Sequence, residues 1–213
     1  MVQAIIFDMD GVIVDSMNIH YNIWKKTGEK FGFVFDKDLL DSVNGMDTLR
    51  IAHEVIEKFS LSVNADEIVK FKRELSENAL KSSVKLFDDV FETINFLKET
   101  GKKIGLATST PSNQMKLTLG QQINKLPFDT IITDDLVQNP KPAPDIFMKC
   151  AETLGVPYSD CAVIEDSLCG IHAAKTAGMI GIAITNTTVA EKFTEADYII
   201  SNLTELKEMI KKI

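Results

Sequence analysis

The chain has 213 residues, of which 45% are apolar and 25% are charged, and this composition suits one soluble domain with a sizeable core, or one domain with a smaller insertion. The formal net charge of −8 argues against nucleic acid or an anionic membrane as a partner, so local positive charge would have to attract any anionic substrate. No apolar stretch approaches the roughly 18 residues that span a bilayer, and no signal peptide is recognisable, so we expect a cytoplasmic protein.

Six short apolar runs, rich in β-branched residues, are typical of buried strands. They cover residues 2–7, 103–108, 130–133, 161–165, 181–185 and 198–200. Apolar residues at helical spacing, with charged, proline or glycine residues at the ends, predict helices over 88–101, 142–155, 167–178 and 204–213. Strands that alternate with helices predict an α/β fold, with a Rossmann-like parallel sheet covered by helices on both faces.

Residues 17 to about 85 interrupt this alternation. Apolar residues recur there at helical spacing, around 19–24, 49–59 and 68–75, and no convincing strand is visible. This pattern predicts a small helical domain, over 16–85, inserted into a core formed by residues 1–15 and 86–213.

Acidic residues stand at the ends of two predicted strands. Asp8 follows the first strand in "AIIFDMDG", with Asp10 two residues later, and "VIEDS" places Glu165 and Asp166 at another strand end. Ligand sites of parallel sheets lie beyond the carboxyl ends of the strands. A carboxylate that faces such a crevice is costly unless a cation neutralises it, and Mg²⁺ suits a site with a few carboxylates, water and a phosphate.

Two other segments offer groups that bind phosphate. "LATST" ends a strand with the hydroxyls of Thr108, Ser109 and Thr110, which can bind phosphate oxygens together with backbone N–H groups. Lys141 lies between two prolines in "NPKPAPD", and the fixed φ of proline limits its freedom. A rigid ammonium near a carboxylate pair suits phosphoryl transfer, which depends mostly on positioning and charge neutralisation.

Taken alone, "DMDG" could also be a simple Asp–Gly turn or a calcium loop. An EF-hand loop needs a preceding helix and a glycine at its sixth position, whereas here a strand precedes and the glycine comes fourth. The calcium alternative is therefore disfavoured, and the turn alternative weakens because three further motifs follow in order.

The segments "DMDGVIVDS", "ATS", "KPAPD" and "EDSLCGI" resemble, in this order, the four motifs of the haloacid dehalogenase superfamily. The helical insertion after the first motif resembles the subgroup with a helical cap, which contains β-phosphoglucomutase and many small-metabolite phosphatases. This resemblance covers nearly the whole chain, although the cap sequence is much less specific than the motifs.

The resemblance implies that Asp8 is the nucleophile, forming an aspartyl phosphate, and that Asp10 is the general acid and later the general base. Gly11 would permit the sharp turn that brings Asp10 back to the site. We expect Asp8→Asn to abolish turnover without loss of the fold, because an exposed strand-end carboxylate contributes little to stability.

The resemblance also assigns the groups that hold the phosphoryl group and the metal. Thr108 and Ser109, with Thr110 beside them, would bind the phosphoryl oxygens, and Lys141 would neutralise charge. The Mg²⁺ ligands would be Asp8, the backbone carbonyl of Asp10, and Asp166, with Glu165 supporting the metal directly or through water.

His20 lies about one turn before Trp24, and β-phosphoglucomutase has a similar pair whose histidine contacts substrate. The alternative for His20 is a partly exposed residue at the seam between cap and core, and Trp24 is expected to pack inside the cap. Ser16 is expected to start the cap helix as its N-cap.

The favoured function is a Mg²⁺-dependent phosphatase for a small phosphorylated metabolite, such as a sugar phosphate, acting as a monomer. Asp10 argues against dehalogenase and phosphonatase activities, because both replace this residue. The alternative is a β-phosphoglucomutase, which interconverts β-glucose 1-phosphate and glucose 6-phosphate. That enzyme binds a second phosphate through a lysine and an arginine, at places where Pro111 and Thr48 stand here. A third hypothesis is a non-catalytic protein that binds phosphometabolites.

Overall fold

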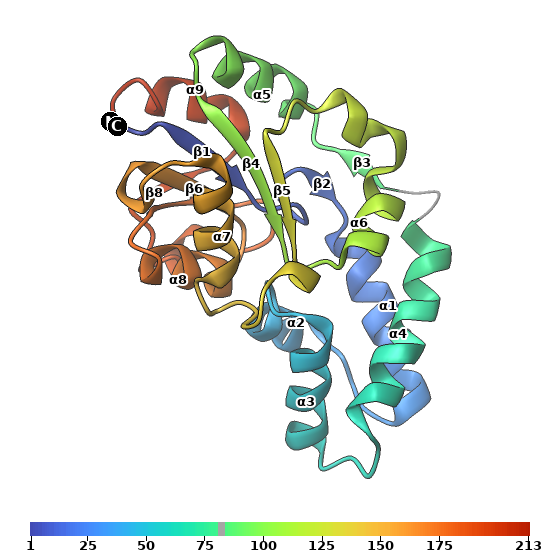
Figure 1. The fold of residues 1–213 in the computed structure, drawn as a ribbon. Helices are drawn as coiled ribbons and strands as arrows, with labels where there is room; N and C mark the ends of the chain where they lie inside the picture. The colour runs from blue at the N-terminus through green and yellow to red at the C-terminus, as the bar shows by residue number, and fades with distance from the viewer. Residues whose placement is uncertain (81–83) are drawn as a thin grey trace.

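A six-stranded parallel sheet forms the centre of the computed structural model, which describes residues 1–80 and 84–213 (Figure 1). The strands pair in the order β5-β4-β1-β6-β7-β8. Their bounds are β1 (Ala4–Phe7), β4 (Lys103–Thr108), β5 (Thr130–Thr133), β6 (Cys161–Glu165), β7 (Ile180–Ile184) and β8 (Tyr198–Ile200). All six predicted strands are confirmed, with shifts of one or two residues at the ends of β1 and β7. Because β1 lies between β4 and β6, the carboxyl ends of these three strands meet.

Helices cover both faces of the sheet, as predicted. Successive strand residues point to opposite faces, so Ile5 and Phe7 belong to one core cluster while Ala4 and Ile6 belong to the other. The first cluster contains α5 (Val90–Glu99), α6 (Ser112–Leu119) and α9 (Leu206–Met209), and the second contains α7 (Asp145–Leu154) and α8 (Leu168–Thr176).

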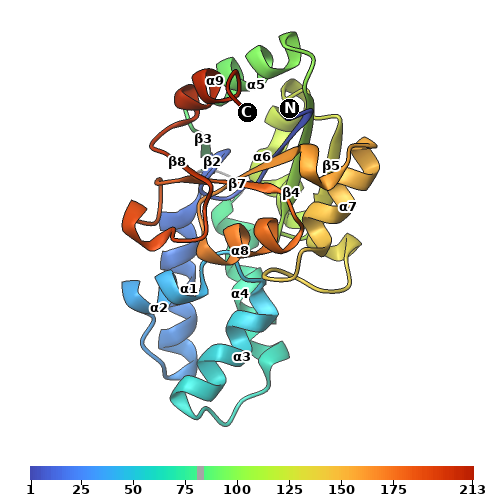
Figure 2. The same ribbon diagram turned by 90° about the vertical axis from the view of Figure 1, so that its left-hand side faces the viewer.

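Four further helices form a cap beyond the carboxyl ends of the strands (Figures 1 and 2). They are α1 (Met17–Phe31), α2 (Lys37–Val43), α3 (Thr48–Phe59) and α4 (Ala65–Leu80). The cap has its own apolar cluster, in which Trp24 stacks on Phe35 with ring centroids 5.4 Å apart, as expected for a packing role of Trp24. No described helix is long and apolar enough to cross a membrane.

Some elements differ from the sequence-based expectations. Helices α2 and α6 were not predicted, because each is short and has few apolar residues. The predicted helix over 204–213 is a 3₁₀ turn, Leu203–Glu205, followed by the single turn of α9.

A small antiparallel ribbon joins the cap to the core. Its strands β2 (Val14–Asp15) and β3 (Lys85–Leu86) come from the two segments that connect these parts. The ribbon was not predicted. The domain boundaries at 15/16 and 85/86 remain a prediction; the first lies at the end of β2 and the second lies inside β3.

Candidate active site

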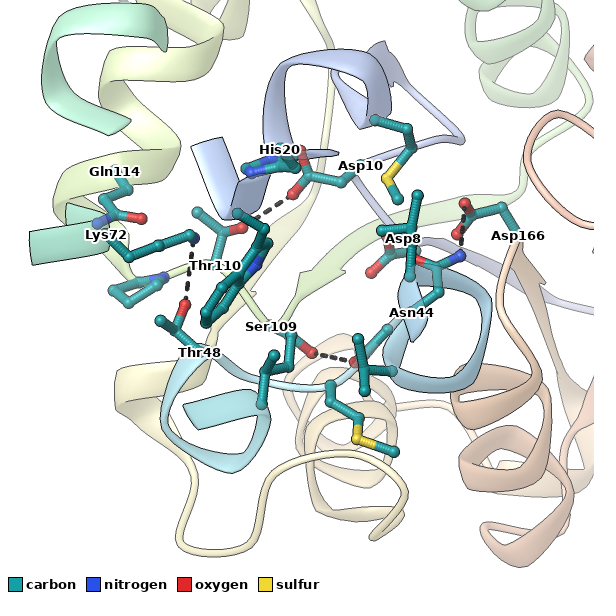
Figure 3. Close-up of a pocket in the computed structure, with 18 residues that line it drawn as sticks. Asp8, Asp10, His20, Asn44, Thr48, Lys72, Ser109, Thr110, Gln114 and Asp166 are labelled. Carbon is teal, nitrogen blue, oxygen red and sulfur yellow. Dashed lines mark hydrogen bonds and ion pairs between the residues drawn. The ribbon is translucent and has the colours of Figure 1, made fainter. Parts of the chain in front are cut away.

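The carboxyl ends of β1, β4 and β6 bring the predicted motifs together. Phe7 pairs with Leu106 on one side and with Ile164 on the other, so the residues that follow these three strands become neighbours. A cavity of about 90 Å³ lies between this edge and the cap (Figure 3). The core contributes Asp8, Asp10, Ser109, Thr110, Gln114 and Asp166 to its lining, and the cap contributes His20, Trp24, Asn44, Thr48 and Lys72.

Lys141 forms a buried ion pair with two carboxylates. Its Nζ donates hydrogen bonds to Asp8 Oδ1 and to Glu165 Oε1, each at 2.7 Å, and the Lys141 side chain is only 1% exposed. Burial alone would lower the pKa of Lys141, but the carboxylates of Asp8 and Glu165 raise it well above its usual range. Lys141 is therefore a fixed positive charge beside Asp8.

Glu165 contacts the ammonium of Lys141, and its side chain is not part of the cavity lining. Its second oxygen, Oε2, accepts hydrogen bonds from the backbone N–H of Ser167 at 2.9 Å and from the Ser167 hydroxyl at 2.7 Å. Both oxygens of Glu165 are thus engaged by protein donors. In this arrangement Glu165 contacts the ammonium of Lys141, and its expected support of a metal, directly or through water, stays a prediction.

Asp166 lies against Gly11 and the segment that follows β7. Its Oδ2 accepts hydrogen bonds from the Thr187 hydroxyl and, at 3.4 Å, from Asn44 Nδ2 (Figure 3). Gly11 has φ +78°, and a Cβ at this position would lie 2.1 Å from Asp166 Oδ2. Only glycine therefore permits both the turn after Asp10 and the close approach of Asp166.

The site holds more negative charge than the protein itself neutralises. Asp8, Glu165 and Asp166 are buried, and among the described residues Lys141 is the only ammonium that forms an ion pair with any of them. Burial raises the pKa of Asp8 well above its usual range, and burial with the nearby Glu165 raises the pKa of Asp166 to about 7.

The excess of buried carboxylates, together with carboxylate oxygens that have no hydrogen-bond partner, suits the binding of a divalent cation. Among the described residues, neither Asp8 Oδ2 nor Asp166 Oδ1 has a hydrogen-bond partner. Within the same residues, no group of three or more His, Cys, Asp or Glu side chains forms a metal cluster. Two carboxylates with a backbone carbonyl, water and a substrate phosphate would fit the ligand set that Mg²⁺ prefers.

Asp10 accepts three hydrogen bonds, from the Ser16 hydroxyl, from Thr110 Oγ1 at 2.8 Å and from His20, whose Nε2 lies 3.2 Å from Oδ1. Burial alone would raise the pKa of Asp10, but these donors, led by His20, lower it to about 2. Ser16 is the N-cap residue of α1, as expected, but its hydroxyl makes no capping hydrogen bond and donates to Asp10 instead.

The hydroxyl-rich segment after β4 lies where it was expected, but its side chains differ in exposure. Thr108 is buried and accepts a hydrogen bond from the backbone N–H of Thr110 at 3.1 Å. Ser109 and Thr110 line the cavity, and the Ser109 hydroxyl donates to the carbonyl oxygen of Gly45 in the cap at 3.0 Å.

The cavity residues that were not among the predicted site residues include Lys72, Gln114 and Asn44. Lys72 is 5% exposed, donates to Thr48 Oγ1 at 3.2 Å and lies 5.9 Å from the ring of Trp24. Burial lowers the pKa of Lys72 to about 8. The signal for Lys72 was its position on the apolar stripe of α4, where a charged residue is unusual.

Comparisons with known proteins agree with this geometry. A sequence model for haloacid dehalogenase-like hydrolases matches residues 5–184. A fructose-1-phosphate phosphatase of Escherichia coli is 30% identical, over 85% of this chain and 95% of that protein. A β-phosphoglucomutase of Bacillus subtilis is 31% identical, over 85% of this chain and 83% of that protein. The crystal structure of a β-phosphoglucomutase from Clostridium difficile superposes with a TM-score of 0.84 at 27% identity, covering 100% and 96% of the two chains.

Proposed function

The chain belongs to the haloacid dehalogenase-like hydrolase family, and from this we propose that it is a magnesium-dependent phosphatase acting on small phosphorylated metabolites of the sugar-phosphate kind. The observation that carries this proposal is the place of Asp8, which lines the cavity together with Asp166 and accepts a hydrogen bond from the ammonium of Lys141. The phosphatase relative that acts on fructose 1-phosphate supports the substrate class.

In the first step, a carboxylate oxygen of Asp8 attacks phosphorus, while the ammonium of Lys141, which contacts Oδ1, holds the carboxylate in place. A bond forms between Asp8 and phosphorus, and the bond from phosphorus to the leaving alkoxide breaks. Asp8, Asp166 and the backbone carbonyl of Asp10 would hold the Mg²⁺ ion, whose charge would offset the negative charge of the phosphoryl group. The Ser109 and Thr110 segment would hold phosphoryl oxygens beside Lys141.

Asp10 moves the proton in both steps. It gives a proton to the leaving alkoxide, and it then takes one from the water that attacks the aspartyl phosphate, so that phosphate is released and Asp8 is restored. With a pKa of about 2, Asp10 is ionised in the arrangement described here and suits the second step. For the first step, the donors around it must rearrange, and His20 is placed to respond because it lines the cavity and contacts Asp10.

The charge of the cap half of the cavity favours a phosphatase over a mutase. A mutase must bind a second phosphate there, and Lys72 is the one Lys or Arg among the described lining residues. Pro111 and Thr48 line the cavity at the places where the mutase carries basic residues, and Arg50 is exposed outside it. A single ammonium is a poor match for a second phosphate dianion. The β-phosphoglucomutase relative keeps the mutase as the second candidate.

Two assays test these candidates. Mg²⁺-dependent hydrolysis of p-nitrophenyl phosphate, lost with chelator and restored by Mg²⁺, is the expected result, and no turnover with any divalent metal would favour a non-catalytic binding protein. Incubation with β-glucose 1-phosphate and a trace of the 1,6-bisphosphate distinguishes a phosphatase from a mutase. Glucose 6-phosphate that accumulates without free phosphate would overturn the phosphatase proposal.

A further inference from the structure

The loop between α2 and α3 connects the cap to the core beside Asp166, the expected metal ligand. Asn44 Nδ2 lies 3.4 Å from Asp166 Oδ2 and 3.3 Å from Thr187 Oγ1, and the next residue, Gly45, accepts a hydrogen bond from the Ser109 hydroxyl. The loop therefore touches the segments that follow three strands of the core, β4, β6 and β7.

The backbone of Gly45 packs closely against the core, so no side chain larger than glycine fits at this position. Gly45 has φ +84°, and a Cβ there would lie 2.2 Å from the Ser167 hydroxyl and 3.2 Å from Cβ of Cys169. The backbone of the loop is thus seated on the start of α8, directly beside Asp166. With Gly45 seated in this way, the Asn44 amide has a defined position against the core.

Asn44 from the cap and Thr187 from the core hold the same oxygen of the Asp166 carboxylate. Asn44 and Thr187 both donate to Oδ2, and Oδ1 has no hydrogen-bond partner among residues 1–80 and 84–213. Thr187 belongs to the core, so its contact does not depend on the cap. The Asn44 contact requires the cap to lie against the core, because Asn44 belongs to the cap loop.

We propose that Asn44 is a positioning residue that links closure of the cap to the orientation of Asp166 for metal binding. This inference rests on the proposed function, because it assumes that Asp166 ligates the metal. A closed cap then strengthens metal binding, and by linkage a bound metal strengthens closure by the same factor. A phosphate group in the cavity favours the closed cap, so phosphate and metal bind cooperatively.

The test measures binding of Mn²⁺, as a probe for the metal site, by calorimetry with and without inorganic phosphate. In the wild type, phosphate should tighten Mn²⁺ binding by a factor within the usual 5–150-fold range of coupled sites. Asn44→Ala should remove most of this gain and leave Mn²⁺ binding without phosphate close to the wild type. The matched control is Asn18→Ala, since Asn18 is an exposed cap residue with no hydrogen bond to a described residue.

The outcomes separate this inference from the proposed function. Wild-type coupling in Asn44→Ala, with normal Mn²⁺ binding, overturns the role of Asn44 and leaves the phosphatase proposal intact. A wild-type protein that binds no Mn²⁺ at all overturns both. Thr187→Val provides a second check, because its effect and that of Asn44→Ala should be non-additive if both act through Asp166 Oδ2.

Discussion

The ammonium of Lys141 lies 2.7 Å from Oδ1 of Asp8, and neither side chain is open to solvent. A buried pair of this kind is costly to break on one side, because the remaining charge has no partner. Replacement of Lys141 by Met leaves Asp8 and Glu165 without a counter-ion. We expect Lys141→Met to lower the free energy of unfolding by about 3–5 kcal/mol and to abolish turnover. Denaturant unfolding of the metal-free protein measures the first effect.

Lys149 offers a matched control for this substitution. It lies eight residues after Lys141, on α7, and its side chain is exposed. Lys149→Met should change stability by less than about 0.5 kcal/mol. If the two variants unfolded at the same denaturant concentration, the ion pair would have no structural importance.

Asp8→Asn should act on stability in the opposite direction from Lys141→Met. The raised pKa of Asp8 shows that its charge is disfavoured in the metal-free site, and Lys141 keeps Glu165 as a partner when Asp8 is neutral. We expect the metal-free variant to be at least as stable as the wild type at pH 7.5, with no turnover. Calorimetry and a phosphatase assay check these two points, and turnover near the wild-type rate would refute the nucleophile assignment.

The position of Asp8 could be predicted from the sequence, but its environment could not. Asp8, Lys141 and Asp166 come from distant segments, and their convergence follows from the rule that parallel strands end at one edge of the sheet. Asp8 was expected to be an exposed carboxylate, whereas it is 7% exposed and paired. Exposure depends on how the cap packs over the strand ends, which strand and helix patterns do not show.

The cap residues illustrate the same limit. His20 was singled out by its distance from Trp24, but its contact with Asp10 depends on the docking of α1 against the core. Asn44 carries no local signal, because an asparagine in a polar loop is ordinary until the loop is placed beside Asp166. Glu165 follows the same rule as Asp166, yet its side chain turns away from the cavity toward Lys141.

Metal-free protein should lose stability as the pH rises. Asp166 has a pKa near 7 in the folded protein and 3.8 as its ordinary value, so the folded state binds more protons than the unfolded state between these values. Stability therefore falls with rising pH across this window. We expect the melting temperature in chelator to fall between pH 5 and pH 7.5, and Mg²⁺ to raise it more at pH 7.5 than at pH 5. Equal Mg²⁺ effects at both pH values would argue against metal binding at Asp166.

Gly11→Ala tests the close packing of the turn against Asp166. An alanine at φ +78° costs about 1–2 kcal/mol, and here its Cβ would also displace Asp166. Gly101→Ala is the control, because Gly101 has φ +79° and nothing lies within 4 Å of an added Cβ. Both variants should share the backbone cost, but only Gly11→Ala should lose the stabilisation by Mg²⁺ and the turnover. Equal Mg²⁺ responses in both variants would show that Asp166 tolerates the displacement.

We expect the buried ammonium of Lys72 to lower the stability of the folded protein. The residue would be kept because it helps to bind substrate. Burial lowers its pKa from 10.5 to about 8, so the folded state disfavours the ammonium that the unfolded state carries freely. This cost, about 3 kcal/mol from the shift in pKa, is full below pH 8 and disappears as the pH rises toward 10.5. Lys72→Met should therefore stabilise the protein at pH 7, with a gain that shrinks toward pH 10.

The same variant should bind substrate less well, because Lys72 is the cation that the described part of the chain presents to the organic half of the substrate. We expect KM for a sugar phosphate to rise more than kcat falls, since Lys72 lies on the cap helix α4 and its hydrogen bond is to Thr48 of the cap. Thermal unfolding at the two pH values and steady-state kinetics measure both effects. A variant that is less stable than the wild type at pH 7 would show that the Lys72 charge is satisfied by its contacts with Thr48 and Trp24.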